Sequence, residues 1–420
     1  MTPTTRVSRA TAAWSLAGLV LLTINLRAAI TGVSPLLGDL RDALSLSGVQ
    51  VSVLTTLPVL CLGLFASLAP VLARRVGAEV AIAGSLVMIT AGIVVRVVPS
   101  PVALYLGTVL AGAGIAMGNV LMPAVIKRAF PERVGSLTGL AMMLMAASGA
   151  VAAGLAVPLD AAGGWRLALA VWAVPSLIAA LTWGPLARGA RRDRPRQEGA
   201  PRAARAGGTL LRSAKAWFVA AFMGLASLMF YVLMSWLPEI MRDAGYAPAT
   251  AGMMVSAMLI VGIPLGFLVP VFAARLRDQR ALVVAVAATM VVGILGLLAA
   301  PEAGWVWVLT LGVGTGSAFP LAYTLLSLRS PSPSVAARLS GMAQTGGYLL
   351  AAAGPLAVGV LHSVTGGWEV SLVLLLALVV PELVFGLLAA RPGFVRPSPD
   401  RVEHLVEAKE IRLPEPARAR

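Results

Sequence analysis

The sequence predicts an all-α integral membrane protein of twelve transmembrane helices, arranged as two parallel six-helix halves. Three observations support this fold class: an apolar composition, regularly spaced apolar segments, and a repeat of the first half in the second. Of the 420 residues, 58% are hydrophobic and 12% are charged, and the mean hydropathy is +0.88. Because a soluble domain carries about 25% charged residues, this composition indicates a protein whose surface faces lipid.

Twelve apolar segments are long enough to cross a bilayer, which takes about 20 helical residues. They are 12–37, 49–73, 78–98, 102–126, 136–158, 166–187, 214–239, 250–273, 281–300, 304–328, 338–362 and 368–390. Only helices and closed barrels satisfy the backbone in lipid, and these segments are too long and too uniformly apolar for barrel strands. The chain has one cysteine, Cys61, and this excludes an internal disulfide and a cysteine-based metal site. Cys61 is expected to be a packing residue.

The net charge of +15 follows the topology of the chain. Of the 33 Lys and Arg residues, 28 lie in the two tails, the central loop and the other loops on the same side. The opposite loops are mainly acidic, with Arg41, Arg166 and Arg242 as their basic residues. By the positive-inside rule, both termini and the central loop are predicted to be cytoplasmic in an inner or plasma membrane. The charge therefore does not indicate nucleic-acid binding.

An internal repeat divides the chain, with an offset of about 200 residues. Glycine, proline and charged positions recur in the same order: Arg41-Asp42-Ala43 as Arg242-Asp243-Ala244, Pro70 as Pro270, Gly112 as Gly312, Gly139 as Gly341, and Gly163-Gly164-Trp165 as Gly366-Gly367-Trp368. We therefore predict an N-terminal tail (1–11), a first half (12–187), a basic cytoplasmic linker (188–213), a second half (214–390) and a C-terminal tail (391–420).

The loop after the second segment reads Pro70-Val71-Leu72-Ala73-Arg74-Arg75-Val76-Gly77-Ala78. This stretch and the two-half repeat resemble the major facilitator superfamily over about residues 12–390. The resemblance implies that Arg74, Arg75 and Gly77 belong to a gating loop. Arg74 departs from the superfamily pattern, because it stands where an acidic residue is expected to latch the cytoplasmic helix ends.

Four further sequence stretches narrow the resemblance to one branch of the superfamily. They are Asn25-Leu26-Arg27-Ala28-Ala29-Ile30-Thr31, Leu54–Val59, Gly114–Pro123 and Gly164-Trp165-Arg166. They resemble the cyanate permease and 2-nitroimidazole transporter branch of that superfamily. The resemblance implies a monomeric secondary transporter that moves a small anionic or electronegative solute by alternating access. Export of drug-like organics such as nitroimidazoles is the alternative, and a solute sensor that does not transport is an alternative from another class.

Other residue patterns restrict the function classes. No Gly-x-x-x-x-Gly-Lys-Ser/Thr loop for ATP occurs in the chain. An enzyme is not expected, because the chain has two histidines, one cysteine and no paired carboxylates within the apolar segments. We accordingly expect no cofactor and no metal ion.

Arg27 is the leading candidate for a binding residue. It follows Trp14 by 13 residues, or about 20 Å of helix, which places it deep in the membrane. A charge at the bilayer centre costs at least about 2.5–3.5 kcal/mol, so Arg27 should face a cavity or a partner. It could anchor an anionic solute, because the guanidinium is a planar fork of donors. It could alternatively pair with polar groups of another helix or reach the outer interface.

The remaining substrate-binding candidates are polar or aromatic groups on segments that should face the centre: Asn119, Tyr231, Trp236, Tyr323, Gln344 and Tyr348. Asn119 lies one turn before Pro123, which frees the Asn119 carbonyl, so its amide could instead repair the kink. Trp236 could instead anchor the outer interface, and the two tyrosines at 323 and 348 could form interhelical hydrogen bonds.

Protons are a possible coupling ion, but the sequence indicates no conventional carrier. Glu382 is the one carboxylate well inside a segment, and its place near the cytoplasmic end predicts surface exposure. His362 lies at the outer end of its segment. Proton coupling through His362 or the acids of the outer loops, a solute that brings its own proton, and facilitated diffusion all stay open.

Overall fold

The computed structural model describes residues 9–192 and 209–396, and these residues form helices and connecting turns with no strand. The first half contains α1 (Arg9–Thr31), η1 (Ser34–Leu36), α2 (Leu37–Leu44), α3 (Gly48–Ala66), α4 (Leu68–Val76), α5 (Ala78–Arg96), α6 (Pro101–Ala129), η2 (Pro131–Arg133), α7 (Val134–Ala170) and α8 (Ala173–Arg192). The second half contains α9 (Ala214–Asp243), α10 (Pro248–Arg275), α11 (Arg280–Ala299), η4 (Pro301–Ala303), α12 (Gly304–Leu328), α13 (Pro333–Thr365) and α14 (Glu369–Ala390). The predicted all-helical fold is confirmed.

The twelve predicted spans map onto these helices. Length and composition identify ten membrane-crossing helices, or eleven when α3 and α4, bent by 49°, count as one span. One of them, the 55-residue stretch Pro131–Pro185, would be about 80 Å long as a straight helix, far beyond a bilayer core of about 30 Å. It is broken at Gly163 and Gly164, where Gly164 has a φ of 75°. The stretch therefore holds two spans, and the count reaches twelve.

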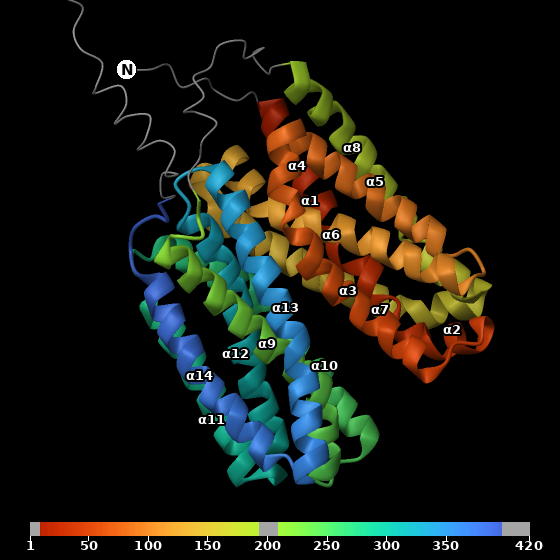
Figure 1. Ribbon diagram of the computed structural model, residues 1–420, viewed down its shortest axis with the longest axis vertical. Coiled ribbons are helices and arrows are strands. Elements are labelled where there is room, and N and C mark those ends of the chain that lie inside the picture. Colours follow the sequence, from red (N-terminus) through yellow and green to blue (C-terminus); the bar gives the residue numbers. More distant parts are fainter. Residues whose placement is uncertain (1–8, 193–208, 397–420) are drawn as a thin grey trace, which may run out of the picture.

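The predicted tails and linker lie mostly outside the described residues, which begin at Arg9, omit 193–208 and end at Arg396. Arg9 and Arg396 lie at the same end of the bundle, here called the terminal end, and the opposite end is called the distal end. In Figure 1 the two halves lie side by side, meet toward the terminal end and diverge toward the distal end.

Glycines bring the two halves into backbone contact near the terminal end. A methyl group on Gly139 of α7 would lie 2.6 Å from the carbonyl oxygen of Phe267 in α10. A methyl group on Gly341 of α13 would lie 2.7 Å from Cγ of Pro70 in α4. Because Gly139 and Gly341 are equivalent in the repeat, the halves touch through two related joints. Small residues of this kind allow helices in a membrane to approach closely.

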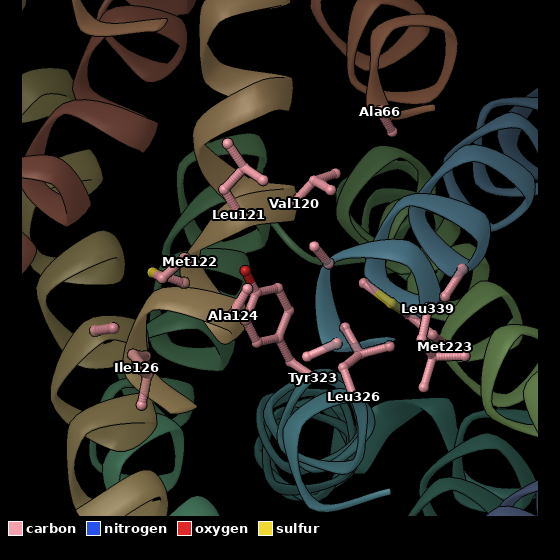
Figure 2. Close-up of a cluster of buried hydrophobic side chains, with 14 of the residues drawn as sticks. Ala66, Val120, Leu121, Met122, Ala124, Ile126, Met223, Tyr323, Leu326 and Leu339 are labelled. Atoms are coloured by element: carbon pink, nitrogen blue, oxygen red, sulfur yellow. The ribbon is translucent and has the colours of Figure 1, made fainter. Parts of the chain in front are cut away.

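An apolar cluster fills the space between these joints (Figure 2). Its buried side chains come from both halves: Ala66, Val120, Leu121, Met122, Ala124 and Ile126 from the first, and Met223, Tyr323, Leu326 and Leu339 from the second. Figure 2 shows the Tyr323 hydroxyl directed toward α6. Apolar side chains of both halves therefore pack against each other between the two joints.

We expect Gly139→Val to destabilise the protein by about 1–3 kcal/mol, because the added side chain would push against backbone atoms that cannot swing away. Gly154→Val on the same helix is the matched control, since nothing lies within 4 Å of a methyl group there. Thermal unfolding of the purified proteins followed by tryptophan fluorescence measures both. Equal melting temperatures for the two variants would contradict this account of the α7–α10 joint.

Candidate functional site

The two halves share a hydrogen-bonded contact at the break in α6. Pro123 has no N–H, so the carbonyl of Asn119 lacks its helical donor. The Tyr323 hydroxyl donates to this oxygen, and Nε2 of Gln344 lies 3.3 Å from it. Both donors belong to the second half. The backbone of Asn119, rather than its side-chain amide, therefore receives the compensating bonds.

Arg27 faces the same region from α1. Its side chain is half-buried beside Gly149 of α7, where an added methyl group would lie 3.5 Å from the Arg27 Cβ. Tyr348 interacts electrostatically with the Arg27 guanidinium and with the Tyr231 hydroxyl. Tyr348 interacts in turn with Tyr323. Of the seven predicted binding residues, all except Asn119 and Trp236 thus form one group. It is here called the central cluster: Arg27, Tyr231, Tyr323, Gln344 and Tyr348.

The central cluster and Asn119 offer both donors and acceptors. Arg27 has no carboxylate within 4.0 Å among the described residues, so its guanidinium is an uncompensated cation. The side-chain oxygens of Asn119 and Gln344 are buried and have no hydrogen-bond partner in the described part of the chain. A small anionic solute would find donors on Arg27, and an N–H or O–H of the solute would find these amide oxygens.

Trp236 lies apart from the central cluster. Its indole N–H donates to the carbonyl of Pro355 at 2.8 Å, and its ring lies 5.5 Å from that of Trp368. Trp368 stacks on His362 with ring centroids 3.8 Å apart, which places Trp236 in an aromatic group at the distal end. These contacts all lie within the second half, so Trp236 joins helices of that half.

The predicted gating loop borders a hollow of about 610 Å³ at the terminal end, between α4, α5, α6 and α13. Gly77 joins α4 to α5 with a φ of 99°, a conformation that favours glycine. Arg74 lines the hollow, as does Arg128 of α6, which forms an ion pair with Glu79. No acidic side chain other than Glu79 lines this hollow, so its wall is basic.

The chain was compared with known protein families and proteins. The model of the Major Facilitator Superfamily matches residues 19–355. This chain belongs to the major facilitator superfamily. It is 39% identical to the 2-nitroimidazole transporter of Escherichia coli (strain K12), covering 91% of the chain and 96% of that protein. It is also 39% identical to the uncharacterized transporter YycB of Bacillus subtilis (strain 168), covering 91% and 94%.

More distant relatives agree with this membership. The cyanate transport protein of E. coli (strain K12) is 30% identical over 83% of the chain and 90% of that protein. Among solved structures, the E. coli fucose:proton symporter matches with a TM-score of 0.70 and 13% identity, over 90% of the chain and 98% of that structure. The proton:xylose symporter XylE matches with a TM-score of 0.69, also at 13% identity, over 91% and 95%. The superfamily fold, and a transporter rather than an enzyme, are thus established.

The structure corrects the expectation for Glu382. This transporter buries the Glu382 side chain to 2% exposure, and neither carboxyl oxygen has a hydrogen-bond partner among the residues that the structure describes. Its helix α14 packs on α9 and α11, as shown one turn later by Gly386, which contacts Val283 and Phe222. Surface placement was wrong because nearness to a helix end does not determine which face of the helix a residue occupies.

Arg96 is a charged residue that sequence reasoning did not single out. It is 1% exposed, and its Nη1 donates to the carbonyl of Ala29 at 2.6 Å. The available signal was its position inside the predicted span 78–98, on the side where basic residues are few. Four arginines fall within the predicted apolar spans; Arg166 and Arg338 are the first residues of theirs, whereas Arg27 and Arg96 lie further inside.

We expect Tyr323→Phe to destabilise the transporter by about 1–3 kcal/mol, because it removes a donor from the buried Asn119 carbonyl. Thr324→Val is the matched control, since the Thr324 hydroxyl bonds only the Pro320 carbonyl of its own helix. Melting temperatures in detergent measure the difference. A Tyr323→Phe protein as stable as Thr324→Val would show that the bond between the halves contributes nothing.

Proposed function

We propose that this transporter carries a small anionic or electronegative solute, with Arg27 as its binding anchor. The supporting observation is a guanidinium with no carboxylate partner among the described residues, one turn before the end of α1, which interacts with Tyr348 of the opposite half. Charged groups inside a membrane are costly, and in transporters they mark the pathway of a substrate or an ion. Binding between the halves, near the membrane midplane, is the arrangement that alternating access requires.

The names of the relatives restrict the solute. They describe transport of 2-nitroimidazole at 39% identity and of cyanate at 30% identity. A nitro group and cyanate share compact, electronegative oxygen or nitrogen atoms that a guanidinium fork can bind. We favour a small anion, because Arg27 carries a full charge with no partner. Export of nitroimidazole-like organics is the rival function.

We also propose an orientation and a motion. The basic loops lie at the terminal end, so this end is assigned to the cytoplasm with both termini inside. Contacts of Gly139 and Gly341 then close the cytoplasmic side, and the divergence in Figure 1 lies on the outer side. In this proposal, residues 12–187 rock against residues 214–390 around the central cluster.

Arg27→Gln is expected to abolish saturable uptake of a small anion into proteoliposomes, because the neutral amide cannot pair with the charge. Cyanate, nitrite, short carboxylates and 2-nitroimidazole are tested side by side. Arg242→Gln is the matched control, since that side chain is 51% exposed at the distal end. Normal insertion of both variants is checked by gel filtration in detergent.

The outcomes separate the alternatives. Saturable anion uptake that persists in Arg27→Gln would refute the assigned anchor. Movement of nitroimidazole that is insensitive to Arg27→Gln would favour the rival exporter. Saturable binding without any movement, in vesicles where a control carrier is active, would favour the sensor.

We propose proton coupling as the second part of the function, with Glu382 as the carrier. A carboxylate without a partner costs several kcal/mol in an apolar interior, so burial favours the protonated acid. Such a group can take up and release a proton when its surroundings become hydrated. The two solved structures named above are those of proton symporters, which is compatible with this part of the proposal.

Glu382→Gln is expected to remove accumulation driven by an imposed pH gradient while leaving solute exchange intact, because the amide keeps the shape but carries no proton. Glu369→Gln, at an exposed position that begins α14, is the control. Accumulation that responds to the pH gradient equally in wild type and Glu382→Gln would exclude Glu382 as the carrier.

A further inference from the structure

Arg96 holds a buried positive charge that no part of the mechanism above uses. It is the last residue of α5 and reaches across to α1, where it bonds the Ala29 carbonyl. Its Nε and Nη2 atoms are buried and have no hydrogen-bond partner among residues 9–192 and 209–396. No carboxylate lies within 4.0 Å of it in the described part of the chain.

The packing of α5 on α6 forces this arginine inward. A methyl group on Gly92 of α5 would lie 2.6 Å from the carbonyl oxygen of Gly107 in α6. A methyl group on Gly107 would lie 2.5 Å from the Cβ of Arg96. The two helices are therefore in backbone contact at this level, and α6 covers the base of the Arg96 side chain. The guanidinium is left between α1 and α3, inside the first half.

A cavity of about 40 Å³ lies at this position, and Arg96 lines it. One water needs about 10–15 Å³ of such volume, so the cavity has room for an ion of up to about three heavy atoms. Its wall is mostly apolar, with Ile30, Leu54 and Ala111 among the lining residues. Ser34, Thr55 and Thr108 also line the cavity, and the Thr108 hydroxyl donates to the Leu104 carbonyl of its own helix at 2.7 Å. The lining includes no acidic side chain.

The positive charge of Arg96 favours an anion over a water molecule as the occupant of this cavity. A water molecule could accept hydrogen bonds from Nε and Nη2, but it would leave the buried charge uncompensated. A buried ion without a counter-charge costs several kcal/mol, and the negative end of α5 offsets only part of this. A monovalent anion satisfies both the charge and the free donors, and the apolar wall suits an anion that sheds water easily.

We propose that the Arg96 cavity binds a small monovalent inorganic anion, such as chloride, nitrite or cyanate, as a fixed part of the first half. This site is separate from the central cluster, because it lies on the α5 side of α1 whereas Arg27 lies beside α7. The anion joins α1, α3, α5 and α6 at the distal end. It stabilises the half itself, whichever solute the transporter carries.

The test measures melting temperatures of the purified transporter in sodium chloride, nitrite and cyanate, against sodium gluconate and sulfate at equal ionic strength. We expect the small anions to raise the melting temperature by about 2 °C or more, saturably, with no effect of gluconate or sulfate. Arg96→Gln should lose this rise, whereas Arg27→Gln should keep it. The Arg27 variant therefore separates this site from the substrate site.

Ala111→Val keeps the proposal testable if Arg96→Gln does not fold, because it fills the cavity and leaves the charge in place. This variant should also lose the stabilisation by small anions. Stabilisation that is absent in wild type, equal for gluconate and chloride, or retained in both cavity variants would overturn the proposal. Loss of solute transport in Arg27→Gln would not affect this result.

Discussion

The carbonyl of Asn119 is the group on which the arrangement of the two halves depends. Pro123 removes its helical donor in the middle of a membrane span, where an unsatisfied carbonyl costs several kcal/mol. Tyr323 and Gln344 supply the missing hydrogen bonds from the opposite half. The break in α6 is therefore stable only while the halves are together, or when another donor replaces these two. A motion that parts the halves must bring water or solute to this oxygen.

The repeat explains how such a motion can be accommodated. Gly139 and Gly341 occupy equivalent positions and press on backbone or proline atoms of the opposite half, on either side of the Asn119 contact. Glycine adds no side chain at either joint, so the two joints themselves can shift with little repacking. The polar bonds at Asn119 fix the closed arrangement, while the two glycine joints provide the surfaces along which it can change.

The sequence alone predicted the helices, because a membrane-spanning helix must be about 20 residues long and mostly apolar, and a hydropathy profile detects both properties. Arg27 was found by the same reasoning, since its depth rules out easy contact with water. Arg96 is the last residue of α5, where a charged residue is ordinary, and Glu382 lies about two turns before the end of α14 at Ala390. Packing by neighbouring helices buries both, and the sequence does not show that packing. The bond of Trp236 to Pro355 joins residues 119 positions apart, and no local pattern indicates it.

The two membrane arginines, Arg27 and Arg96, have the same chemistry but different surroundings. Arg96 is enclosed on all sides by helices of one half, so the motion between halves does not change its environment. Arg27 interacts with Tyr348 of the other half, so on the proposed function its hydration changes when the halves move. When water is excluded from Arg27 and no solute is bound, its charge is left without a counter-charge, which is costly. A bound anion neutralises that charge. On the proposed function, the transporter therefore occludes more readily with its solute than without it, and this difference favours exchange over an empty return.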